Sequence, residues 1–368
     1  MPTNQNSKNM LVVVHGMGED TREGVEAEVR QVLSDKLGSN IEDKVDVRAI
    51  AYNKVFNDWR RRAADNWKQA VNALEGRVHF TRTKSFLEKA VKVNDDNFYA
   101  THWLDVVLYM STLGVRVQLE VARQMTQILQ EFNNGGNLNS RKIVLMAHSL
   151  GTAVTHDTLH KMWHGGFEDA RYNNLSKMPF TFSAFYQLAN TSRLLKTGID
   201  PTSRQTAVRP APSGMMELMY NVHHKFDPIA LVKAFKIDDL ARWLPEQNWP
   251  DEFFFDVELS GVHAVNVHGM THYLSDPRLH CPLFNLLIDD YSYPPDRSAQ
   301  YKKHDKGVFG KKVDKLKASI DAIDFDEIES ISEIAEFWKK IEAVQSDADA
   351  KLEDLTAALK AIADKGDE

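Results

Sequence analysis

The stretch MLVVVHGMGE, residues 10–19, begins with an uninterrupted apolar run and ends in a turn that contains glycine. Short continuous runs rich in β-branched residues are typical of strands that are buried on both faces of a parallel sheet. The next segment, up to Leu37, has helical apolar spacing with Asp20 or Thr21 as its cap, and VDVRAIAY (45–52) follows as a second strand. This order predicts a βαβ unit, and therefore a parallel sheet with right-handed crossovers.

Residues 1–300 continue this alternation and are predicted to form one α/β domain with about six mostly parallel strands. Further strands are expected at KIVLMA (142–147), FTFSAFYQL (180–188), MELMYNV (216–222) and FFDVELSGVHAVNV (254–267), the last as one strand or a pair. His263 is expected to lie within that last strand.

Two segments depart from the alternation. Residues 53–115 carry aromatic and apolar side chains mostly at helical spacing, which predicts a helical insertion, interpreted as a cap. Residues 305–368 repeat apolar side chains at spacings of three and four between charged ones, which predicts a separate C-terminal helical module. Such a stripe favours helix packing, with self-association or a protein partner as the alternative. The basic segment KKHDKGVFGKK (302–312) is interpreted as a solvated linker.

The chain has 368 residues, a formal net charge of −7 and a single cysteine, Cys281. The negative charge gives no general attraction to nucleic acid, so a nucleic-acid partner is not expected. One cysteine cannot form an intramolecular disulfide. Neither a signal peptide nor an apolar run of about 18 residues is recognisable, and we therefore expect a cytoplasmic protein.

Ser149 lies in KIVLMAHSLGT (142–152), where a predicted strand ends at Ala147 and a predicted helix opens at Leu150. A tight strand-to-helix turn of this kind presents a serine hydroxyl above the sheet as a nucleophile. Gly151 matches the second glycine of the G-x-S-x-G pattern, and Ala147 replaces the first. The alternative is an ordinary strand-to-helix corner.

If Ser149 attacks an acyl group, the reaction also requires hydrogen-bond donors that stabilise the developing oxyanion. HGMGE (15–19) follows the first strand and enters a helix, so the backbone amide of Met17 is expected to pair with that of Leu150. His15, Gly16 and His148 are the candidates for lining the substrate pocket.

A nucleophilic serine also needs a base that takes its proton and an acid that orients this base, and both should follow later strands. Asp227-Pro228 comes just after the strand at 216–222, and we take Asp227 as the acid, with a helix cap as the alternative. His272 lies on a loop with enough slack to reach Ser149 and is preferred as the base, whereas His268 at the end of the strand is its competitor.

The order Ser149, Asp227, His272, together with VVVHGMGE, AHSLGT, FDPIA and GMTHYL, resembles the α/β-hydrolases of the lipase and esterase type. YNVHHKFDPIA is in addition similar to the acid region of intracellular DDHD-type phospholipases. The resemblance implies a serine hydrolase of carboxylic esters, with lipid or phospholipid acyl esters as leading substrates and no cofactor.

Several other interpretations remain open. A thioesterase or a peptidase would use the same three residues, and an inactive scaffold would keep the fold and recruit partners through its helical tail. Zinc is not expected at His263, His268 and His272, because no H-E-x-x-H helix accompanies them. Trp59 and Trp67 on the insertion suit either a cap packed over the site or peripheral contact with a membrane.

Overall fold

The structure of the chain is a computed structural model. It describes residues 8–16, 21–74, 105–134, 140–173, 175–177, 181–195, 198–203, 205–210, 214–231, 234–235, 253–263 and 267–307. Met17, residues 75–104 of the predicted cap and residues 308–368 of the predicted C-terminal module lie outside these ranges.

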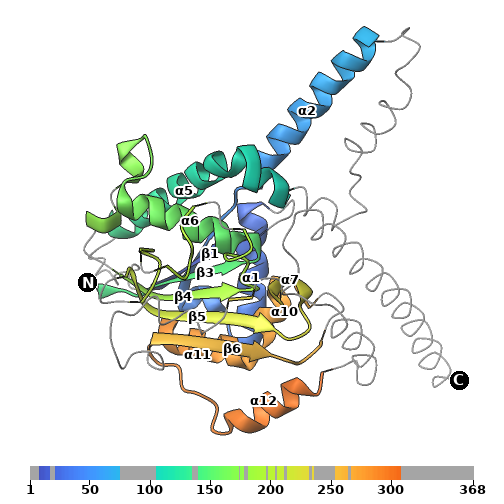
Figure 1. Ribbon diagram of the computed structural model, residues 1–368. Helices are drawn as coiled ribbons and strands as arrows, with labels where there is room; N and C mark the ends of the chain where they lie inside the picture. The colour runs from blue at the N-terminus through green and yellow to red at the C-terminus, as the bar shows by residue number, and fades with distance from the viewer. Residues whose placement is uncertain are drawn as a thin grey trace, which may run out of the picture.

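A six-stranded, all-parallel sheet forms the centre of the molecule, with the strand order β2-β1-β3-β4-β5-β6 (Figure 1). The α/β class and the parallel sheet agree with the expectation from the apolar runs. The strands are β1 (Asn9–Val14), β2 (Val45–Ile50), β3 (Ile143–His148), β4 (Phe182–Leu188), β5 (Met216–His224) and β6 (Phe254–Leu259).

Helices cover both faces of the sheet because alternate side chains of the strands point to opposite faces. Met10, Val12 and Val14 of β1 belong to the core beneath α5 and α6, whereas Leu11 and Val13 belong to the core with α1, α10 and α11. The helical elements are α1 (Arg22–Leu37), η1 (Ile41–Asp43), α2 (Asn53–Leu74), the π-helix η2 (Tyr109–Leu113), α5 (Gly114–Asn134), α6 (Leu150–His164), η4 (Ala170–Tyr172), η5 (Leu175–Lys177), α7 (Pro228–Leu231), α10 (Met270–Ser275), α11 (Pro277–Leu287) and α12 (Arg297–Asp305).

The last strand is shorter than the sequence suggested. β6 ends at Leu259, and His263 lies in an irregular segment rather than in a strand. The Ser260 hydroxyl donates to Asp305 at 2.7 Å, and the His263 Nε2 atom lies 2.8 Å from the backbone oxygen of His304. The side chains of this segment are therefore engaged with α12, a helix that replaces the first part of the expected basic linker.

Helix α2 begins against the core and then leaves it. Phe56 near its start is buried, and Arg60 forms an ion pair with the buried carboxylate of Asp105. The rest of α2 extends away from the sheet (Figure 1). Among the described residues, no helix combines the length and the apolar character needed to cross a membrane.

The site discussed below is placed by the order of the strands. The chain goes from β1 to β2 on one side and then returns to place β3 on the other side of β1. At such a switch point the carboxyl ends of two neighbouring strands lead away in opposite directions, which is where open α/β sheets bind ligands. At this switch point His15 and Gly16 directly follow β1, and Ser149, which directly follows β3, lies beside them.

Candidate functional site

Ser149 occupies the turn between β3 and α6 in a backbone conformation that is unusual for a residue other than glycine, with φ 54° and ψ −130°. Such a conformation is strained and persists only when its surroundings enforce it. The Ser149 amide donates to the Leu188 backbone oxygen at 2.9 Å. Its carbonyl oxygen accepts hydrogen bonds from the hydroxyls of Thr152, at 2.7 Å, and Thr191, at 2.9 Å. These bonds hold the turn in place.

Two glycines allow the segments after β1 and β3 to approach each other. A methyl carbon on Gly151 would lie 2.6 Å from the His15 backbone oxygen, and one on Gly16 would lie 2.9 Å from the Ser149 Cβ atom. Both distances are too short for real carbon contacts. Glycine at 151 is therefore required by the packing of α6 on β1, which is the role of the last glycine in the sequence pattern.

Ser149, His268 and Asp227 form a buried, hydrogen-bonded series. The Ser149 Oγ atom lies 2.9 Å from His268 Nε2, and His268 Nδ1 lies 2.8 Å from Asp227 Oδ2. Because an ionised carboxylate only accepts hydrogen bonds, His268 carries its proton on Nδ1 and offers the bare Nε2 to the serine hydroxyl. All three side chains are buried. This arrangement can remove the proton of the serine when its oxygen attacks an electrophile.

Asp227 stays ionised although it is fully buried. Its Oδ1 atom accepts from the backbone amides of Ile229, at 3.0 Å, and Ala230, at 3.4 Å, and its Oδ2 atom accepts from the Tyr273 hydroxyl at 2.7 Å. Burial alone would raise the pKa of Asp227, but the charge interaction with His268 and the hydrogen bonds from His268 and Tyr273 outweigh it and lower the pKa to about 2.

His272, the preferred base, does not lie on a loop as the sequence suggested. Residues 270–275 coil into α10 instead of forming a slack loop. The His272 Nε2 atom accepts from the His263 backbone amide at 3.1 Å, and the His272 ring lies against that of His224, with the centroids 5.1 Å apart. His268, the competitor, is placed just before the helix and reaches Ser149. Gly269 caps α10 without a side-chain hydrogen bond, and a glycine is only a weak sequence signal for a helix start.

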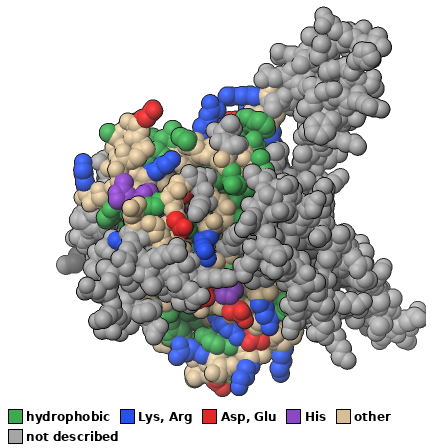
Figure 2. Space-filling model, in the orientation of Figure 1, with side chains coloured by type: hydrophobic (Ala, Val, Ile, Leu, Met, Phe, Trp, Pro, Cys, Tyr) green, Lys and Arg blue, Asp and Glu red, His purple; other side chains and the backbone are tan. Residues whose placement is uncertain are grey.

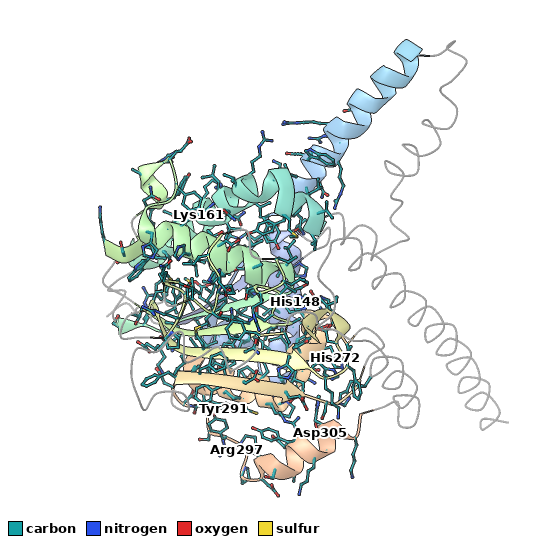
Figure 3. The ribbon with its side chains drawn as sticks, in the orientation of Figure 1. His148, Lys161, His272, Tyr291, Arg297 and Asp305 are labelled. Atoms are coloured by element: carbon teal, nitrogen blue, oxygen red, sulfur yellow. The ribbon has the colours of Figure 1, made fainter. Side chains whose placement is uncertain are left out.

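His148 contacts the base through the main chain of His268, and its expected role in the substrate pocket stays a prediction. Its side chain is buried, and its Nε2 atom lies 2.6 Å from the backbone oxygen of His268. Burial lowers the pKa of His148 well below its ordinary value. Figure 3 shows His148 and His272 at the same end of the sheet. His15 is half-buried, with its ring centroid 6.2 Å from that of His148, and its pocket role and that of Gly16 stay predictions.

The amide of Leu150 is placed next to Ser149 by the start of α6. Leu150 is the first residue of this helix, so its N–H is one of the terminal amides that have no acceptor within the helix. A positive helix end beside a nucleophile suits a developing negative charge. Met17, the expected second donor, lies outside the described residues.

One cluster of metal-type ligands occurs within the described ranges, away from Ser149, at Asp276, His304 and Asp305. The Arg278 guanidinium binds Asp305 through two bonds, of 2.8 and 2.5 Å, and lies 3.4 Å from Asp276. A cationic side chain already neutralises these carboxylates, so the cluster fits an ion-pair network better than a metal site.

The comparisons with known proteins add no family. No protein-family model matches the chain, and a search of curated proteins finds no significant similarity.

Proposed function

We propose that the chain is a serine hydrolase of carboxylic esters, with Ser149 as nucleophile, His268 as general base and Asp227 as the acid that orients it. The single observation that carries the proposal is the pair of contacts on His268, with Ser149 Oγ 2.9 Å from Nε2 and Asp227 Oδ2 2.8 Å from Nδ1. The order of the three residues along the chain is that of the α/β-hydrolases, and the turn at Ser149 has the strained conformation that their nucleophile elbow requires.

In the proposed reaction, Ser149 Oγ attacks the ester carbonyl while its proton moves to His268 Nε2. Asp227 keeps its charge and stabilises the imidazolium that forms. The Leu150 amide, with Met17 as the expected second donor, stabilises the oxyanion, and each donor of this kind contributes on the order of 3 kcal/mol. His268 then returns the proton to the leaving alcohol, and a water molecule, activated in the same way, hydrolyses the acyl-enzyme.

The proposed substrates are acyl esters, with lipid and phospholipid esters leading. This choice follows from the resemblance of AHSLGT and YNVHHKFDPIA to lipases and DDHD-type phospholipases. Thioesters and peptides use the same chemistry and remain alternatives, because the pocket and not the triad selects the leaving group.

Peripheral contact with lipid belongs to the same proposal. Trp59 on α2 is 37% exposed, and Val115 and Leu119 on α5 are 64% and 40% exposed. Figure 2 shows hydrophobic side chains on the surface of the helical layer that contains α5. Binding to zwitterionic liposomes should weaken in Trp59→Ala and persist in Arg123→Ala, which removes an exposed charge of α5 together with its ion pair to Glu120. A wild type that does not bind liposomes would remove the lipid surface from the proposal.

Hydrolysis of p-nitrophenyl esters of graded acyl length tests the activity. We expect turnover in the wild type, its loss in Ser149→Ala and its retention in Ser183→Ala, where a buried serine of β4 is changed instead. A fluorophosphonate should label Ser149 in the wild type. A folded wild type that neither turns over esters nor is labelled would favour the scaffold alternative.

A further inference from the structure

Two buried donors contact the base and the acid, one at the main chain of His268 and the other at the carboxylate oxygen of Asp227 that also holds His268. His148 lies against the backbone oxygen of His268 at 2.6 Å, and the Tyr273 hydroxyl contacts Asp227 Oδ2 at 2.7 Å. We propose that His148 and Tyr273 are positioning residues, which fix the base by its main chain and the acid by its carboxylate. This inference rests on the proposed hydrolase function.

The direction of the His148 bond follows from its partner. A carbonyl oxygen only accepts, so His148 carries its proton on Nε2 and donates it to His268. The ring stays neutral, because burial lowers the pKa of His148 well below its ordinary value. His148 also directly precedes Ser149 in the chain. One side chain therefore links the main chain of the nucleophile to the main chain of the base.

The direction of the Tyr273 bond is fixed in the same way. The backbone amide of His224 donates to the Tyr273 oxygen at 3.1 Å, which leaves the hydroxyl proton for Asp227. Burial, followed by the negative charge of Asp227, raises the pKa of Tyr273 well above its ordinary value. Tyr273 therefore keeps its hydroxyl proton and remains a donor at neutral pH. Through it, Asp227 is tied to the end of β5.

The two donors act on one short segment. His268 and Tyr273 are five positions apart, at the entry to α10, and the rings of His148 and Tyr273 meet edge to face with their centroids 6.0 Å apart. Between them they attach this segment to β3 and to β5, the strands that carry Ser149 and lead to Asp227. Reaction rates depend steeply on such placement, since a shift of about 1 Å can lower a rate about 100-fold.

Substitutions that keep shape and remove one donor test this role. His148→Phe and Tyr273→Phe should lower kcat for a p-nitrophenyl ester by about 10- to 100-fold, the range for a hydrogen bond to a charged or catalytic group, and leave KM within about threefold. The rate of inactivation by a fluorophosphonate should fall in parallel. His148→Gln, which keeps a donor at a similar reach, should recover most of kcat. If His148→Phe does not fold, His148→Leu, which also has no donor, is the second variant.

Two control variants lose comparable groups away from the site. His156→Phe removes a buried imidazole that lies 2.9 Å from the Thr206 hydroxyl, and Tyr52→Phe removes a buried hydroxyl that has no hydrogen-bond partner among the described residues. Both should keep the kcat of the wild type. Folded His148→Phe and Tyr273→Phe with unchanged kcat, or controls that lose as much, would overturn the positioning role. A wild type that a fluorophosphonate does not label would instead overturn the proposed hydrolase and this role with it.

Discussion

The Nε2 atom of His268 lies 2.9 Å from the Oγ atom of Ser149, although the two residues are 119 positions apart in the chain. The contact results from the parallel sheet, which brings the carboxyl ends of β3, β5 and β6 to the same edge. Ser149 leaves β3, Asp227 follows β5, and His268 follows β6 after a loop. The strands thus form a rigid scaffold, and the segments that follow three of them bring the nucleophile, the acid and the base together.

The assignment of the base gives the first prediction. His268→Ala should lower kcat for ester hydrolysis by about 10⁴- to 10⁶-fold, because the serine loses the group that accepts its proton. His272→Ala should stay within about threefold of the wild type, since its ring contacts His263 and His224 and not Ser149. Steady-state kinetics of the two variants decide the matter. Full activity in His268→Ala, or a large loss confined to His272→Ala, would contradict the geometry.

The sequence predicted those features that depend on local pattern. The βαβ alternation follows from apolar runs, and the position of Ser149 follows from a strand that ends where a helix begins. The base could not be chosen in this way, because the direction of His272 depends on the coiling of α10 and on its packing against α1. Tyr273 was missed for the same reason. No local sequence pattern marks this tyrosine as a hydrogen-bond partner of Asp227, which lies 46 positions earlier.

The close approach of α6 to β1 gives a prediction about folding. Gly151→Ala should strongly destabilise the protein and abolish activity, because the new methyl carbon would lie 2.6 Å from the His15 backbone oxygen and 2.7 Å from that of Val14. Gly198→Ala is the matched control, since a methyl carbon there has no neighbour within 4 Å. Thermal unfolding of both variants is the measurement. A Gly151→Ala protein that unfolds like the wild type would show that the segments can separate without penalty.

The buried histidines behind the site predict a loss of stability in acid. Burial lowers the pKa of His272, and likewise that of His224, to about 4. As the pH falls below about 6.5, these histidines become protonated in the unfolded chain but stay neutral in the folded chain until about pH 4. The free energy of unfolding therefore decreases across this interval. Each ring should remove on the order of 1–2 kcal/mol between pH 7.5 and pH 5.

Denaturant unfolding at the two pH values tests this loss. His272→Gln keeps an acceptor for the His263 amide but cannot be protonated, so it should reduce the difference in stability between pH 7.5 and pH 5. Val115→Gln, a change at an exposed position of α5 that adds no titratable group, should leave that difference unchanged. An equal acid loss in the wild type and His272→Gln would assign the effect to other groups.

Helix α12 gives the last prediction, because it packs on the segment that leads from β6 to His268. The Arg278 guanidinium binds the Asp305 carboxylate through two bonds, and the Asp305 carboxylate also accepts from Ser260. Both charged side chains are partly buried, so removing one leaves the other poorly solvated. Arg278→Met and Asp305→Asn should each lower the free energy of unfolding, and the double variant should lose less than the sum, with a coupling of about 1–2 kcal/mol.

If α12 holds the segment between β6 and His268 in place, each single variant should also lower kcat, and the double variant should lower it by less than the product of the two effects. The reason is that His268 lies eight positions after Ser260. Strict additivity in both measurements would show that this ion pair neither stabilises the fold nor supports the base.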